Sequence, residues 1–112
     1  MSFWQDVIGF ALDHETRLHM EEQAAWIARE PGNPRPYYHL AQFCRMNGQA
    51  DHALGLLLEA VRLDPGFADA HVSLAEMYAI GGDLAAARRH AAAAAENGNP
   101  QAEEMLARHG TP

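Results

Sequence analysis

Residues 13–22, DHETRLHMEE, bring two histidines and three glutamates close to the spacing of a zinc site. The helical zinc signature of metalloproteases sets two histidines four residues apart, so that both imidazoles project from one face of the helix. His14 and His19 are instead five residues apart, which separates them by about 140° around a helix. Both cannot hold one ion while the helix stays regular. We therefore predict no metalloprotease centre here.

A second cluster in the same stretch has better geometry. Glu15, His19 and Glu22 follow one another at spacings of four and three, so a helix would place them on a single face. Carboxylates and an imidazole are metal ligands, but a solvated polar face gives the same residue types. No bound metal and no other cofactor is predicted.

The remaining reactive residue types form no catalytic pattern. The other histidines are scattered singly along the chain, and Cys44 falls among the apolar positions of its segment, as a small buried hydrophobe would. The sequence contains no nucleophile elbow, phosphate-binding loop or paired carboxylates. We predict that the protein is not an enzyme.

Composition narrows the classes of partner. The chain has 112 residues, enough for one domain with a modest core, and a formal net charge of −7, which opposes binding to nucleic acid. A single cysteine excludes an internal disulfide. No apolar run approaches the length of a membrane helix, and the amino terminus lacks the basic start of a signal peptide. These features predict a soluble, cytoplasmic protein that binds neither nucleic acid nor membrane.

The sequence repeats itself at an offset of 34 residues. The matching positions carry identical small or apolar residues, or Gly, at corresponding points. They are Leu40 with Leu74, Ala41 with Ala75, Gly48 with Gly82, Ala53 with Ala87 and Ala60 with Ala94. The offset also pairs Pro31 with Pro65 and Met46 with Ile80. Such regularity indicates repeated structural units.

Each unit is predicted to be two helices joined by a short turn. Asn33 and Pro34 are typical of a helix start, and Asn47-Gly48 of a helix end. A second helix then extends to the residues before Pro65. The next unit repeats this plan over residues 68–81 and 84–97, with Asp83 as the cap of its second helix.

These units resemble tetratricopeptide repeats, the family of helix–turn–helix repeats of about 34 residues. Leu40-Ala41, Gly48 and the later alanines occupy the family's motif positions, and Pro65 closes the first unit. Two features depart from the motif. Tyr37 and His71 stand where Trp is common, and the second unit closes one residue late, at Pro100.

The resemblance implies an all-α fold, a short right-handed α-solenoid of helix–turn–helix repeats with a carboxy-terminal capping helix. We expect one domain over residues 1–112, with repeats at 34–67 and 68–101 and a cap at 100–110. Residues 2–31 are either a degenerate repeat or one long helix, because His14 stands where the other units have Gly. The apolar side chains of this terminus could cover the domain's own core or dock on a second copy, giving a self-associating homodimer. They are Phe3, Trp4, Val7, Ile8 and Phe10.

The resemblance also implies a function, because first helices in this family line a concave groove that takes peptide segments of partner proteins. The corresponding groove residues are Arg35, Tyr38, His39, Gln42 and Arg45 in one unit, and Asp69, Val72, Ser73 and Glu76 in the other. The family's clamp for chaperone tails needs Lys and Asn at such positions, and neither unit has them. The expected partner is therefore a protein or peptide segment of mixed charge.

Overall fold

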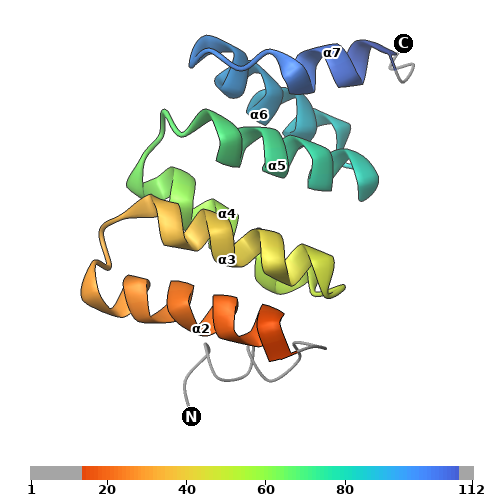
Figure 1. The fold of residues 1–112 in the computed structure, drawn as a ribbon. Helices are drawn as coiled ribbons and strands as arrows, with labels where there is room; N and C mark the ends of the chain where they lie inside the picture. The colour runs from red at the N-terminus through yellow and green to blue at the C-terminus, as the bar shows by residue number, and fades with distance from the viewer. Residues whose placement is uncertain (1–13, 109–112) are drawn as a thin grey trace. The chain divides into compact units, whose positions relative to one another are not determined.

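The computed structural model describes residues 14–108, and these residues form helices and turns with no strand (Figure 1). The described helices are α2 (His14–Arg29), α3 (Pro34–Met46), α4 (Ala50–Leu63), α5 (Ala68–Ile80), α6 (Leu84–Glu96) and α7 (Gln101–Arg108). The all-α prediction is confirmed for this part of the chain. The apolar segment at residues 3–10 lies outside the described residues, so its predicted roles stay predictions.

The chain divides into two compact units. The first ends at Leu63 and holds α2, α3 and α4, while the second begins at Asp64 and holds α5, α6 and α7. Within each unit, helices that follow one another in sequence pack together, as expected for a helical-repeat fold. The handedness of the predicted superhelix stays a prediction.

The start of α3 follows from its sequence. The Asn33 side chain accepts a hydrogen bond from the Arg35 backbone N–H at 3.0 Å, which satisfies one of the donors left free in a first turn. Pro34 occupies the first helical position, where no N–H is needed. The second unit uses Asp83 in the same way, because its carboxylate accepts from the Ala86 N–H at 3.1 Å at the start of α6.

Both first helices end in the same hydrogen-bonded turn. Gly48 and Gly82 have positive φ angles of 76° and 89°, which glycine adopts without steric cost. The residue after each glycine donates a backbone hydrogen bond to the last turn of the helix. The Gln49 N–H donates to the Cys44 carbonyl at 2.8 Å, and the Asp83 N–H donates to the Tyr78 carbonyl at 2.9 Å. This is the Schellman arrangement, and it explains why Gly recurs at the 34-residue offset.

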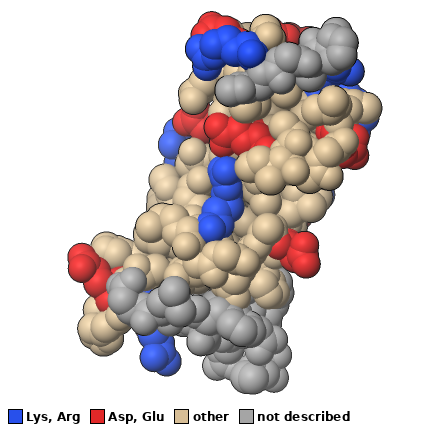
Figure 2. All heavy atoms as spheres, turned by 90° about the vertical axis from the view of Figure 1, so that its right-hand side faces the viewer, with Lys and Arg blue, Asp and Glu red and all other residues tan. Residues whose placement is uncertain are grey.

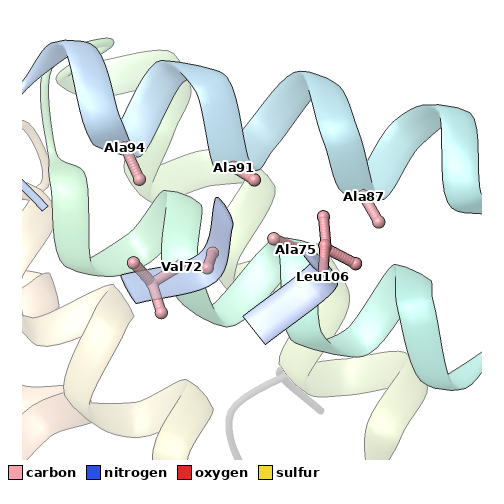
Figure 3. Packing of buried hydrophobic residues seen from close by; sticks show 7 residues of the cluster. Val72, Ala75, Ala87, Ala91, Ala94 and Leu106 are labelled. Carbon is pink, nitrogen blue, oxygen red and sulfur yellow. The ribbon is translucent and has the colours of Figure 1, made fainter. Parts of the chain in front are cut away.

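Small residues at the helix crossings form the centre of each unit. In the first unit Ala41, Ala53 and Ala60 have no exposed surface, and larger buried residues such as Met20 and Leu40 fill the space around them. In the second unit, alanines of α6 point toward Val72 and Ala75 of α5 and toward Leu106 of α7 (Figure 3). The short side chains allow the helix backbones to approach closely. Helix α7 packs against both α5 and α6.

Candidate partner-binding face

Helix α3 carries the basic half of the predicted groove residues. Arg35 and His39 are exposed, while Tyr38, Gln42 and Arg45 are half-buried. The rings of Tyr38 and His39 meet edge to face, with centroids 5.4 Å apart. The helix contains two arginines and one histidine and no acidic residue. A ligand segment on this face would therefore meet hydrogen-bond donors and positive charge beside an aromatic ring.

Helix α5 carries the acidic half, but only part of it is accessible. Asp69 is exposed and its carboxylate accepts a hydrogen bond from the Asn99 side chain at 3.2 Å. Glu76 is half-buried. Val72 and Ser73 are only 7% and 4% exposed, in contrast with the expectation that both face outward. Val72 belongs to the core cluster with Leu106, because the capping helix covers its side of α5.

Two exposed apolar residues were not among the predicted groove positions. Met46, 74% exposed, ends α3, and Ile80, 83% exposed, ends α5. They are equivalent at the 34-residue offset, and each directly precedes the turn that closes its helix. Their shared place before a turn was the signal that could have identified them. Each unit thus presents one large apolar side chain to solvent at the end of its first helix.

Charge on the surface is mixed in sign. Figure 2 shows basic and acidic side chains interspersed with uncharged ones on the face in view. On α4, Arg62 donates two hydrogen bonds to the Glu59 carboxylate, at 2.8 and 2.5 Å, so part of this charge is already paired. Such a surface suits a partner of mixed charge better than a polyanion.

The cluster in the first helix has the predicted geometry. His19 Nε2 lies 3.9 Å from Glu15 Oε1, and His19 Nδ1 lies 3.5 Å from Glu22 Oε1, so all three side chains share one face of α2. All three are at least half exposed, and the His19 ring stacks on Phe43 of α3 with centroids 5.8 Å apart. Within residues 14–108, no group of three or more His, Cys, Asp or Glu side chains has a geometry that could hold a metal ion.

Cys44 has no exposed surface, and burial raises the pKa of its thiol to about 11. At neutral pH the sulfur is therefore protonated, whereas a nucleophilic cysteine requires the thiolate. The residue packs as a small apolar side chain in the first unit.

The two departures from the repeat motif at Tyr37 and His71 have a common structural role. The Tyr37 hydroxyl donates to the Pro31 carbonyl oxygen at 3.1 Å, and His71 Nε2 lies 2.8 Å from the Pro65 carbonyl oxygen. Both pairs are six residues apart and related by the 34-residue offset. Each side chain therefore links its first helix to the loop before it, and at both positions a large ring carries the polar atom that makes the contact.

This architecture, with two units of helix–turn–helix built on small residues and Schellman turns, defines a helical-repeat protein. Residues 34–77 match the family model described as the tetratricopeptide repeat. A stretch of 64 residues is 39% identical to the TPR repeat-containing thioredoxin TTL4 of Arabidopsis thaliana. The match covers 57% of this chain and 9% of that protein, so the chain spans about a tenth of the relative's length. Over these residues the chain is similar to tetratricopeptide-repeat proteins.

Tetratricopeptide repeats generally mediate protein–protein interactions, and repeats of this kind are typically non-enzymatic. Within the described part of the chain, no helix is long and apolar enough to cross a membrane.

Proposed function

We propose that this protein is a non-enzymatic interaction module that binds a segment of a partner protein along its first helices. The observation that supports the proposal most strongly is the outer face of α3, where Arg35, Tyr38 and His39 lie on a helix free of acidic residues and Met46 is exposed at its end. Aromatic and arginine side chains combine a large contact area with directed polar groups, and they dominate binding hot spots.

The charge of the two first helices specifies the partner further. Helix α3 has only basic charged side chains, whereas the charged side chains of α5, Asp69 and Glu76, are acidic apart from the buried His71. An acidic stretch of a partner would complement α3, and a basic stretch would complement α5. A cytoplasmic partner is part of the proposal, since the only cysteine is a free, buried thiol, as is usual in a reducing compartment.

The test begins with a displayed peptide library selected on the purified chain, followed by titration of one selected peptide. We expect enrichment of peptides that carry both signs of charge. Tyr38→Ala should raise the Kd by about thirtyfold, equivalent to about 2 kcal/mol, with unchanged helical content. Arg45→Glu should slow association most clearly at low salt, because exposed charges steer over about a Debye length.

Arg17→Glu is the matched control, since it reverses an exposed charge on α2, a helix that carries none of the proposed binding residues. It should leave both the Kd and the association rate of the selected peptide unchanged. If Tyr38→Ala and the parent protein bind the peptide with equal affinity, the peptide does not bind on α3 as proposed.

A further inference from the structure

Two imidazole rings join α5 to α6 inside the second unit. His71 Nδ1 lies 3.0 Å from His90 Nδ1, and the rings are 5.2 Å apart with an interplanar angle of 29°. On its other side, the His90 ring stacks on Tyr78 at 5.6 Å and 7°. His71 is 7% exposed and His90 is half-buried. His90 of α6 is thus in ring contact with residues seven positions apart on α5.

The loop before α5 determines where the protons of this pair lie. His71 Nε2 is 2.8 Å from the Pro65 carbonyl oxygen, which can only accept, so Nε2 must carry a hydrogen. In a neutral His71, Nδ1 is then a lone-pair acceptor. The 3.0 Å contact becomes a hydrogen bond when His90 Nδ1 carries its own hydrogen and donates it.

This arrangement limits how many protons the pair can take up. A first extra proton can bind His90 Nε2, since His90 Nδ1–H still donates to His71. A second would have to bind His71 Nδ1, where it would point at the His90 N–H across 3.0 Å and place two cations in contact. The hydrogen bond between α5 and α6 must then break.

The groups around the pair do not offset the cost of adding protons to it. Burial, then the neighbouring His71 and the Arg89 guanidinium, lowers the pKa of His90 below its ordinary value of 6.5. On α5, Tyr78 faces the His90 ring, and Asp69 is engaged with Asn99. In the loop, Asp64 accepts from the Gly66 N–H. On α7, Glu103 lines the same pocket as Arg88 of α6. The other charged residues of these helices are Glu76, Glu96, Glu104 and Arg108.

The first unit provides an internal comparison. At the 34-residue offset, His71, Tyr78 and His90 correspond to Tyr37, Cys44 and Leu56. Tyr37 makes the same bond to the preceding loop through a hydroxyl, and Leu56 is a buried apolar residue. Neither side chain gains a charge between pH 7.5 and pH 5. The histidine pair is therefore an addition to the repeat plan and is confined to the second unit.

We propose that the hydrogen bond between His71 and His90 is a proton-sensitive link between α5 and α6, so that the second unit loses stability in mild acid more steeply than the first unit. The unfolded chain binds a proton on each histidine below pH of about 6.5. In the folded pair, burial and the neighbouring cations oppose the first proton, on His90, and the second would break the hydrogen bond between Nδ1 of His71 and Nδ1 of His90. The folding equilibrium constant of the unit should fall about tenfold per pH unit for each excluded proton. The pair therefore contributes its full stabilisation to the second unit above pH of about 6.5, and this contribution declines as the pH falls below that value. The inference is independent of partner binding.

The first experiment measures the tautomers directly. A two-bond proton–nitrogen correlation spectrum of the ¹⁵N-labelled full chain at pH 7.5 should show His71 protonated at Nε2 and His90 at Nδ1. If His90 carries its hydrogen on Nε2, two lone pairs would face each other, and the proposal would be overturned.

The second experiment follows urea unfolding from pH 7.5 to pH 5.0, using backbone amide signals of α6 for the second unit and of α4 for the first. The parent chain should show the steepest loss in α6. His90→Asn should show a shallower loss, because an amide N–H can still donate to His71 and only one proton is excluded. The double variant His71→Tyr/His90→Leu places the residue types of the first unit in the second, and its α6 signals should show the smallest loss of stability between pH 7.5 and pH 5.0.

His14→Asn is the matched control, since it removes an exposed histidine from α2 and should leave the pH dependence of α6 as in the parent. A parent chain whose α6 signals unfold at the same urea concentration at pH 7.5 and pH 5.0 would refute the proposal. If the double variant does not fold, the proposal is still tested by the measured tautomers and by the comparison of the parent chain with His90→Asn.

Discussion

Replacing Leu106 by Ala tests whether α7 stabilises the second unit as a cap. Leu106 is 7% exposed and contributes its side chain to the cluster formed by Val72 and the alanines of α6 (Figure 3). The substitution removes three carbons, worth about 0.8 kcal/mol each in transfer free energy, or about 2.4 kcal/mol together. A cavity adds to this cost where the walls cannot relax. Because α7 is an eight-residue helix packed at one side of the unit, it can shift and keep that addition small.

We therefore expect Leu106→Ala to lower the free energy of unfolding by about 2–3 kcal/mol, measured by urea denaturation followed by far-ultraviolet circular dichroism. Leu84→Ala is the matched control: it makes the same chemical change in the same unit, but Leu84 is 37% exposed. The control should cost less than about 1 kcal/mol. Equal losses for the two variants would show that α7 does not pack on α5 and α6 as described.

Three further predictions concern packing, hydrogen bonding and thiol chemistry. Ala75→Leu should overpack a fully buried crossing and cost about 1–3 kcal/mol in urea denaturation, whereas Ala85→Leu at an exposed site of α6 should be nearly neutral. Tyr37→Phe should cost about 0.5–1.5 kcal/mol in the same assay, because the Pro31 carbonyl loses its donor; no loss would contradict the role assigned to that bond. Cys44, with a pKa of about 11, should react with a disulfide reagent at pH 8 only after unfolding, and rapid labelling of the native chain would refute its burial.

The parts of the fold that depend on neighbouring residues could be predicted from the sequence. The start of α3 follows from Asn33 and Pro34, and its end from Gly48, because caps and Schellman turns are local features. The 34-residue offset then extended this plan to the second unit. The helices α5 and α6 end one residue before the predicted bounds, at Ile80 and Glu96.

The parts that depend on contacts between distant residues could not be predicted. Val72 matches the half-buried Tyr38 at the offset, yet it is buried, since the capping helix contributes Leu106 against it. The contact between His71 and His90 joins residues 19 apart on different helices, so no helical periodicity indicates it. Repetition of sequence predicts a common backbone, but it does not predict what covers each copy.

The position held by Tyr37 and His71 shows how a repeat can keep one structural bond while changing its chemistry. Both rings reach the carbonyl of the proline six residues earlier, so the loop before each first helix is held in the same way. The phenol of Tyr37 is buried, which raises its pKa and keeps its hydroxyl a donor. An imidazole makes the same bond through Nε2 but retains a second nitrogen, and in this chain that nitrogen meets His90. The proton sensitivity that we propose for the second unit therefore originates at a position whose structural role both units share.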